Sequence, residues 1–265
     1  MFYVLAPFRF LFKLYFGSVF FIVLLVQYPI YFILTRSPKT ANVIIFLKRY
    51  VWTSLMQIFM LVGVYRLKKT KLGKGPYIIC PNHSSYYDIV LMYRFIPGKV
   101  IFMGKSELKK WPLLNVFFKN GNFHIAVDRK NPIDAKKALT MAEKRIDEGK
   151  SIVIFPEGTI PDNAPVLNRF KSGAFKLAIE KQIPVVPVTF LDNWRLMSDP
   201  VKLFGPCRPG IARAIIHEPI ETKGMTEKDV LSLQQRVHAI IENDLNVYIY
   251  PIINKRKEWQ TKKSN

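Results

Sequence analysis

The chain opens with two long stretches that carry no charged side chain. The first covers residues 14–35, and as a helix rising about 1.5 Å per residue it could cross a hydrocarbon layer of about 30 Å. Pro29 is expected to kink its second half. The second covers residues 50–65 and is short for a full crossing. We therefore predict a two-helix, membrane-associated element over residues 1–65.

Beyond residue 76, short apolar runs alternate with longer amphipathic stretches. The apolar runs, which predict strands, are residues 77–80, 100–104, 122–127, 151–155, 185–190 and 211–216. The amphipathic stretches, which predict helices, are residues 89–95, 107–119, 132–148, 173–181 and 226–243. This alternation favours an α/β domain over residues 76–245, with a mixed, largely parallel sheet flanked by helices. Pro184 and Pro187 suggest that the strand at 185–190 lies near an edge or contains a bulge.

Two basic segments border this domain. Residues 66–75 read RLKKTKLGKG, which predicts a charged linker between the N-terminal helices and the α/β domain. Residues 246–265 end in KRKEWQTKKSN, which predicts a basic and loosely held C-terminal tail.

The charge of the chain points to an anionic partner. Forty Lys and Arg residues against 19 Asp and Glu residues give a formal net charge of +21, which suits nucleic acid or an anionic membrane surface. No acidic residue precedes Asp88, and the basic residues before it lie between apolar, aromatic-rich stretches. We therefore expect anionic membrane lipids, and no nucleic acid, as partners. A noncatalytic protein that binds a membrane or nucleic acid through its charge is the alternative class.

The positions of these cations also bear on how the apolar stretches meet a membrane. Two full spans would carry residues 36–49, with two Lys and two Arg, to the translocated side, although cations tend to stay in the cytoplasm. Two helices that dip into one leaflet leave every cation at one interface. We favour this monotopic arrangement over two true spans, and over a hairpin buried in a soluble fold.

Residues 82–88, Asn-His-Ser-Ser-Tyr-Tyr-Asp, lie between a predicted strand and a predicted helix, where a side chain can stand clear of the fold. His83 is a candidate general base and Asp88 is its candidate orienting partner. Positions five apart differ by about 140° around a helix, so the two can meet only if His83 lies on the turn and Asp88 inside the helix. The alternative is an Asn82 helix cap with a solvated imidazole beside it.

Two further loops follow strands that are expected to end at the same edge of the sheet. Residues 155–159, Phe-Pro-Glu-Gly-Thr, bring Glu157 there, together with Gly158 for close backbone approach and Thr159 for its hydroxyl. Arg129 follows another strand, and its planar guanidinium suits a phosphate. The alternatives are a turn with an exposed glutamate and a surface salt bridge of the arginine.

Three stretches, in this order, resemble the motifs of the PlsC-like glycerolipid acyltransferase family, whose best-known members are lysophosphatidic acid acyltransferases. They are residues 82–88, residues 155–159 and residues 186–188 (Val-Pro-Val), within a resemblance that covers about residues 76–215. The resemblance implies an acyl-thioester donor, either acyl-CoA or an acyl carrier protein, and a lysophospholipid or glycerol-phosphate acceptor. It also implies attachment to the cytoplasmic face of a membrane, often through an N-terminal two-helix element.

The resemblance further implies roles by position. His83 is similar to the general base of the family, and Asp88 to the residue that orients this base. Arg129 is similar to an arginine that contacts the acceptor phosphate. Glu157 and Gly158 are similar to residues that line the acceptor site, and the proline of residues 186–188 is similar to one near the acyl donor.

One departure from the family concerns the acceptor. Many members have arginine after the Gly-Thr pair, where this chain has Ile160. Lys105 or Lys171 could supply the missing phosphate contact, or the acceptor could be another lysolipid. We therefore expect a membrane-bound O-acyltransferase that converts 1-acyl-glycerol-3-phosphate into phosphatidic acid, with a lyso-aminolipid acyltransferase as the alternative.

The residue types indicate a mechanism. A neutral imidazole can take a hydroxyl proton near neutral pH, and a thioester is activated enough for direct attack without a covalent enzyme intermediate. Amides at the helix start could stabilise the oxyanion, and we expect Ser84 and Ser85 to be cap or turn residues. Because the chain has only Cys80 and Cys207 as cysteines, and no Gly-rich nucleotide loop, we expect no metal and no bound cofactor.

Overall fold

The computed structural model describes residues 6–68, 70–118, 123–128, 131–199 and 202–254. Its centre is a sheet with the strand order β1-β7-β6-β2-β5-β3-β4, in which β6 and β7 are antiparallel and every other pair is parallel. The strands are β1 (Val62–Lys68), β2 (Ile78–Pro81), β3 (Val100–Lys105), β4 (His124–Val127), β5 (Ser151–Val153), β6 (Val185–Phe190) and β7 (Gly210–Ile216). The predicted mixed, largely parallel sheet is confirmed.

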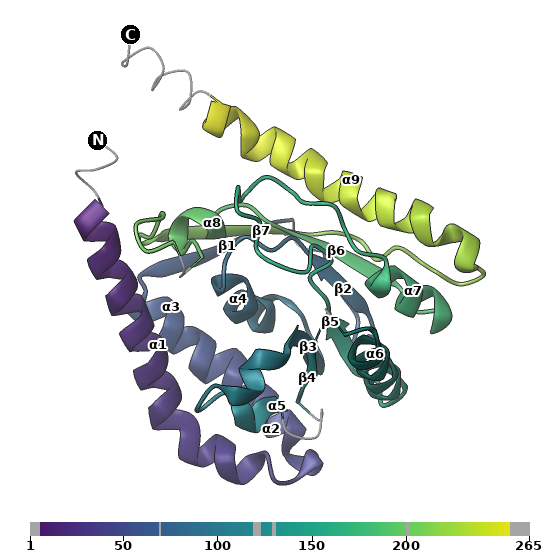
Figure 1. Cartoon of the computed structure of the whole chain (residues 1–265), viewed down its shortest axis with the longest axis horizontal. Coiled ribbons are helices and arrows are strands. Elements are labelled where there is room, and N and C mark those ends of the chain that lie inside the picture. The colour runs from purple at the N-terminus through teal and green to yellow at the C-terminus, as the bar shows by residue number, and fades with distance from the viewer. Residues whose placement is uncertain (1–5, 69, 119–122, 129–130, 200–201, 255–265) are drawn as a thin grey trace.

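Helices cover both faces of this sheet (Figure 1). They are α1 (Ala6–Leu34), α2 (Ala41–Phe46), α3 (Thr53–Phe59), α4 (Tyr87–Phe95), α5 (Asn115–Phe118), α6 (Pro132–Asp147), α7 (Gly173–Glu180), α8 (Asn193–Leu196) and α9 (Val230–Tyr248). Successive side chains of a strand point to opposite faces. Accordingly, Ile79 of β2 packs in a core with α1, α3 and α4, whereas Ile78 and Cys80 pack in a second core with α6, α7 and α9.

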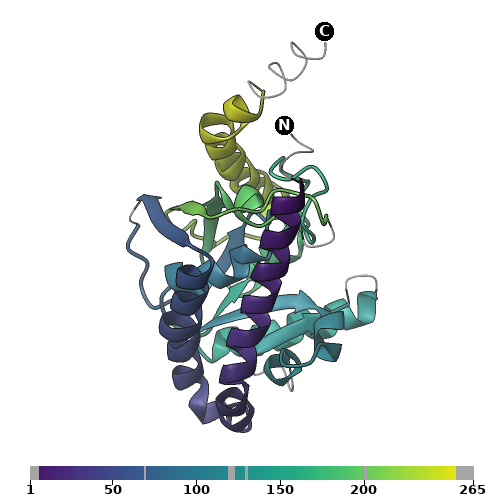
Figure 2. The same cartoon turned by 90° about the vertical axis from the view of Figure 1, so that its left-hand side faces the viewer.

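Helix α1 lies along the rest of the molecule over its whole length (Figure 2). Near its start, the Lys13 ammonium donates to Ser198 Oγ at 2.9 Å. In its middle, the Phe16 ring meets the edge of Tyr87, with 6.0 Å between the ring centroids. Near its end, Tyr31 packs on Phe117 with 4.9 Å between the centroids. Among the described residues, α1 is the one helix that is long and apolar enough to cross a membrane.

The second apolar stretch differs from its prediction. Its helical part starts before residue 50, at Ala41 of α2, and ends at Phe59 of α3. A π-helical segment, Leu47–Trp52, joins α2 to α3. Residues 62–68 then form β1, which pairs with β7, so the predicted linker at 66–75 begins inside a strand. The reason is that buried and exposed side chains alternate along this segment, as in a strand, but the exposed ones among residues 62–65 are uncharged, so the sequence does not reveal the alternation. Val62 and Val64 pack against the core, whereas Tyr65 is exposed.

The helix predicted over residues 107–119 is wrong as one continuous element. A 3-10 helix (Ser106–Lys110) is followed by a break and then by the short α5. Pro112 explains the break, because a residue that precedes proline avoids the helical region. Trp111 is accordingly extended, with ψ 125°, and Leu113 has a φ of 67°. Residue 119 lies outside the described residues.

Strand β6 is an interior strand and carries an irregularity at Pro187. Val188 is opposite Ile216 and Val185 is opposite Ile220, so three residue steps on β6 face four on the other segment. A proline fits such a bulge, because it has no N–H to donate to the neighbouring strand. The predicted edge position is wrong, and the extra residue lies on the 216–220 segment opposite Pro187 and not on β6 itself.

The C-terminal helix continues into the predicted tail. Thr226 and Asp229 form a capping box before α9, and the helix runs to Tyr248 because Leu245 and Ile249 are buried in the core. Residues 246–248 of the predicted tail are therefore helical. Residues 255–265 lie outside the described residues.

Candidate active site

His83 and Asp88 meet at the carboxyl end of β2. His83 lies on the turn after this strand, and Asp88 is the second residue of α4. The distance from His83 Nδ1 to Asp88 Oδ2 is 2.9 Å. The Asp88 side chain is fully buried, whereas the His83 side chain is 13% exposed. The geometry predicted for this pair, a histidine on the turn and an aspartate inside the helix, is confirmed.

Asp88 accepts hydrogen bonds on both of its carboxylate oxygens. Oδ2 accepts from the backbone N–H groups of Ser84 at 2.7 Å and Ser85 at 2.9 Å, and Oδ1 accepts from Asn193 Nδ2 at 2.6 Å. A buried carboxylate needs such partners to remain charged. Because Asp88 occupies these two amides, the expectation that amides at the helix start stabilise an oxyanion is wrong for Ser84 and Ser85.

Asn193 was missed by the sequence reasoning. It begins α8, directly after β6, and it is fully buried. Since β6 runs parallel to β2 and next to it, the carboxyl ends of both strands lie at one edge of the sheet. The signal in the sequence was the position of Asn193. It is a polar residue three positions after β6, and β6 is the neighbour of β2, which His83 follows.

The remaining residues of this turn hold its shape. Asn82 does not cap α4: its side chain accepts from Phe190 N at 2.7 Å and donates to Phe190 O at 3.1 Å, which ties the end of β2 to the end of β6. Ser85 Oγ accepts from Tyr87 N at 2.9 Å and donates to Met197 O at 2.6 Å. Ser85 is thus a turn residue, as predicted.

Glu157 supports the histidine from the neighbouring strand, β5. Its Oε1 accepts from the backbone N–H of His83 at 2.7 Å, and its Oε2 accepts from that of Asn168 at 2.9 Å. Burial raises the pKa of Glu157 to about 7, although both hydrogen bonds oppose this shift. Phe155 stacks on the His83 ring with 4.0 Å between the centroids. Glu157 lies at the predicted edge, where its two hydrogen bonds hold the histidine loop in place.

The other residues predicted to bind substrate vary in their placement. Gly158 has a φ of +82°, and a Cβ on it would lie 3.1 Å from the Lys171 nitrogen, so this ammonium lies against the glycine. Thr159 and Lys171 are exposed. Lys105 is exposed at the carboxyl end of β3, on the same edge of the sheet. Arg129 lies outside the described residues.

Two observations limit what else this site contains. Ile160, at the position where an arginine was expected, is buried and apolar, so it offers no contact to an anion. Within the described parts of the chain, no group of three or more His, Cys, Asp or Glu side chains is placed to hold a metal ion.

Known proteins share both the sequence pattern and the fold. Residues 61–191 match the family model described as Acyltransferase. The chain is 30% identical over 176 residues to human 1-acyl-sn-glycerol-3-phosphate acyltransferase alpha, an alignment that covers 63% of this chain and 58% of the human protein. It is 28% identical over 204 residues to the 1-acyl-sn-glycerol-3-phosphate acyltransferase of Saccharomyces cerevisiae, covering 76% and 66% of the two chains. These alignments thus span about three fifths of the relatives' own length.

A solved structure extends the likeness beyond the matched region. The crystal structure of the 1-acyl-sn-glycerophosphate (LPA) acyltransferase PlsC from Thermotoga maritima superposes with a TM-score of 0.74. The superposition covers 92% of this chain and 99% of the other at 19% sequence identity. At this identity the likeness establishes a shared fold.

Proposed function

Because the chain belongs to the PlsC-like acyltransferase family, we propose that it is a membrane-bound O-acyltransferase that makes phosphatidic acid. It moves a fatty acyl group from an acyl thioester, acyl-CoA or acyl carrier protein, to the free hydroxyl of 1-acyl-glycerol-3-phosphate. The observation that carries this proposal is the 2.9 Å contact between His83 and the buried Asp88. The two named relatives support the choice of acceptor, since both are called 1-acyl-sn-glycerol-3-phosphate acyltransferases.

The contacts of His83 support a role as general base. When Nδ1–H donates to Asp88, the neutral ring has a free lone pair on Nε2, which takes the proton from the acceptor hydroxyl as its oxygen attacks the thioester carbonyl. The imidazolium then returns this proton to the departing thiolate. Asp88 stabilises the imidazolium, and Phe155 fixes the plane of the ring. No covalent enzyme intermediate and no bound cofactor are needed.

Recognition of the acceptor phosphate falls to Lys171. This lysine lies against Gly158 and is exposed on the loop that carries Glu157, so its ammonium is available to a phosphate beside His83. Lys105 and Thr159 are exposed near the same edge and form the rest of the acceptor surface. A lyso-aminolipid acceptor is the second candidate, and the specific observation in its favour is the buried Ile160.

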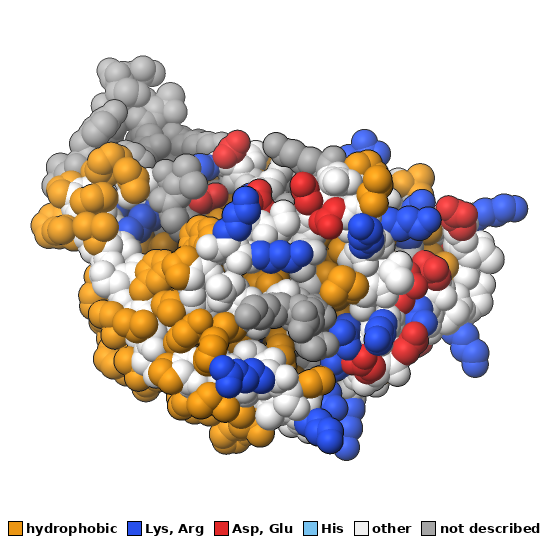
Figure 3. Space-filling view, turned by 60° about the horizontal axis from the view of Figure 1, so that its bottom comes forward, with side chains coloured by type: hydrophobic (Ala, Val, Ile, Leu, Met, Phe, Trp, Pro, Cys, Tyr) orange, Lys and Arg blue, Asp and Glu red, His pale blue; other side chains and the backbone are white. Residues whose placement is uncertain are grey.

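The N-terminal helix attaches the protein to the membrane from one side. Contacts near its start and near its end hold α1 against the α/β domain, and they favour a helix that lies in one leaflet over one that crosses the bilayer. Hydrophobic side chains gather over the side of the molecule where α1 lies (Figure 3). They include Leu11, Ile22, Leu25, Val26 and Ile33, each more than half exposed. The leaflet is the cytoplasmic one, in keeping with the basic turn at Arg36 and Lys39.

The test is an assay of the purified protein with both donor types and a panel of lyso acceptors with and without phosphate. We expect acyl transfer to 1-acyl-glycerol-3-phosphate, and a loss of about 100- to 10,000-fold in the His83→Ala variant. His238→Ala is the matched control, because it removes another histidine, on α9, and should leave the rate unchanged. Full activity in a folded His83→Ala protein would rule out the mechanism, and transfer only to phosphate-free acceptors would select the second candidate.

A further inference from the structure

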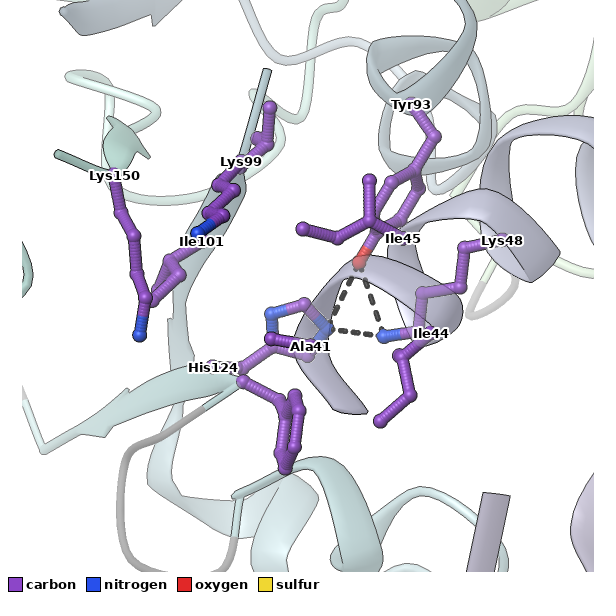
Figure 4. A pocket seen from close by; sticks show the side chains of 11 residues that line it. Ala41, Ile44, Ile45, Lys48, Tyr93, Lys99, Ile101, His124 and Lys150 are labelled. Carbon is purple, nitrogen blue, oxygen red and sulfur yellow. Dashed lines mark hydrogen bonds between the residues drawn. The ribbon is translucent and has the colours of Figure 1, made fainter. Parts of the chain in front are cut away.

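A pocket opens at the amino edge of the sheet, opposite the edge that carries His83 (Figure 4). It lies between α2 and the starts of β3, β4 and β5, and it is partly open to solvent. Its polar side chains are Lys48, Lys99, Lys150, His124 and Tyr93. Among the described residues that line it, none is a carboxylate.

Three of these side chains form a buried triangle. Lys48 Nζ lies 2.7 Å from His124 Nε2 and 3.1 Å from the Tyr93 hydroxyl, and the hydroxyl lies 2.9 Å from the same histidine nitrogen. The N–H of Phe102 donates to His124 Nδ1 at 3.3 Å, so in the neutral ring Nε2 carries the proton. In Figure 4 the polar atoms of the three side chains point toward one another, with Lys99 and Lys150 on the other side of His124.

The lysine of this triangle is buried without a compensating anion. Lys48 is 6% exposed, and it forms no ion pair with the described acidic residues. Its nitrogen lies 3.6 Å above the centre of the Phe117 ring, a contact that favours a cation. Burial nevertheless holds its pKa well below the usual value for lysine. Burial also lowers the pKa of His124, and the charge of Lys48 adds to this effect. An anion bound nearby would remove both penalties.

The two outer lysines add positive charge at the same place. Lys99 is exposed and precedes β3. Lys150 is largely buried, precedes β5 and pairs with Glu148 at 2.7 Å. Glu148 offsets the charge of Lys150 but does not line the pocket, and a concave site whose lining carries more amines than carboxylates attracts anions.

We propose that this pocket binds a phosphate group, supplied either by the headgroup of a membrane lipid or by free phosphate. One wall of the pocket is apolar and comes from Ala41, Ile44 and Ile45 of α2. The same helical stretch leaves Val43, Phe46 and Tyr50 about half exposed, so apolar surface that a lipid can contact lies close to the pocket. The site is separate from the acceptor site at the opposite edge of the sheet.

The experiment measures binding, so that its result does not depend on catalysis. Inorganic phosphate is titrated against the full-length protein and the thermal unfolding midpoint is recorded, with sulfate-free buffer at constant ionic strength. The test variant is Lys99→Gln/Lys150→Gln. The matched control is Lys136→Gln/Lys137→Gln, which removes the same charge from exposed positions on α6. A second variant, Lys48→Met, removes the buried amine. In a parallel arm, the wild type, the test variant and the control variant are each bound to phosphatidylcholine vesicles with and without phosphatidic acid.

We expect phosphate to raise the midpoint of the wild type and of the control equally, and to bind the test variant about fivefold more weakly. Acyl transfer by the test variant should stay at the wild-type level. If the test variant also loses the extra binding to phosphatidic acid vesicles, the occupant is a lipid headgroup. If it loses only the response to inorganic phosphate, the occupant is free phosphate. An equal phosphate response in wild type, control and test variant, or no response in the wild type, would overturn the proposal. If Lys48→Met does not fold, the comparison of the test variant with the control variant still decides whether the pocket binds phosphate.

Discussion

The carboxylate of Glu157 accepts a hydrogen bond from the backbone N–H of His83, although 74 residues separate the two in sequence. This bond joins the loop after β5 to the turn after β2, so the two motifs that mark the family are one physical unit. Glu157 fixes the backbone of the histidine, Asp88 fixes its ring nitrogen and Phe155 fixes the plane of its ring. As the proposed base, His83 therefore meets a substrate already oriented, which reduces the entropy lost in reaching the transition state.

Asn193→Ala tests the support beneath Asp88. The change removes the donor to Asp88 Oδ1 and leaves a fully buried carboxylate oxygen unpaired, which costs about 1–3 kcal/mol of stability. We expect a lower kcat with little change in KM for either substrate, because the loosened aspartate holds the imidazole less firmly. Urea unfolding and steady-state kinetics measure the two effects.

The control for this prediction is Asn168→Ala. Asn168 meets the site only through its backbone N–H, which donates to Glu157, so the loss of its side chain should leave kcat unchanged. A kcat of Asn193→Ala equal to that of the wild type would show that Asp88 keeps its position without this amide.

The sequence predicted most strands and helices whose hydrophobic pattern is clear within a short segment. It also predicted that the site forms at the carboxyl edge of the sheet. The alternation of strands and helices from residue 76 onward fixed the carboxyl ends of β2 and β5, and with them the meeting of His83 and Glu157. Two of the errors in the fold arose where a local pattern was ambiguous. An uncharged run concealed the strand Val62–Lys68, and an amphipathic run concealed the break at Pro112.

The partners of Asp88 could not be predicted, because they depend on three-dimensional placement. Asn193 reaches the aspartate from α8, which follows a different strand, 105 positions further along the chain. Likewise, the backbone partners of Glu157 come from the turn at His83 and from Asn168, and no spacing in the sequence indicates them. The triangle of Lys48, Tyr93 and His124 unites a helix of the N-terminal region with α4 and β4, and no spacing in the sequence indicates it.

The membrane-facing side of α1 is tested by Ile22→Lys/Leu25→Lys. Both side chains are 58% exposed in an apolar region, and burial of such a side chain in lipid is worth about 1.5–3 kcal/mol. We expect binding to anionic vesicles to weaken at least tenfold, although the charge of the protein becomes more positive. Vesicle co-sedimentation at constant salt measures this binding.

Ile133→Lys is the control for the membrane variant. Ile133 is also a highly exposed isoleucine, but it lies on α6, which covers the other face of the sheet. Its replacement should not weaken binding. Equal binding of both variants would show that α1 does not enter the bilayer.

Lys171→Ala tests the contact to the acceptor phosphate. Loss of a charged hydrogen bond costs about 1.5–3 kcal/mol, so kcat/KM for 1-acyl-glycerol-3-phosphate should fall about tenfold or more. A lyso acceptor without phosphate should react at an unchanged rate. Lys176→Ala is the matched control, because Lys176 is exposed and forms only a 3.5 Å surface pair with Glu227. An equal loss on both acceptors would assign Lys171 to the loop and not to the phosphate.

Glu157→Gln tests the effect of burial on the carboxyl that holds the histidine loop. Burial raises the pKa of Glu157 from 4.5 to about 7. In this interval the folded protein binds a proton that the unfolded chain has lost, so the free energy of unfolding falls as pH rises from about 4.5 to about 7, by a few kcal/mol at most. Above pH 7 this group contributes no further slope. Urea unfolding across this range should show the fall in the wild type and not in Glu157→Gln.

Glu148→Gln is the control and should keep the fall in the free energy of unfolding between pH 4.5 and pH 7. The neighbouring Arg145 and Lys150 lower the pKa of Glu148 to about 2, so this carboxyl loses its stabilising effect only in more acid solution. An identical slope in wild type and Glu157→Gln would mean that another group titrates in this interval.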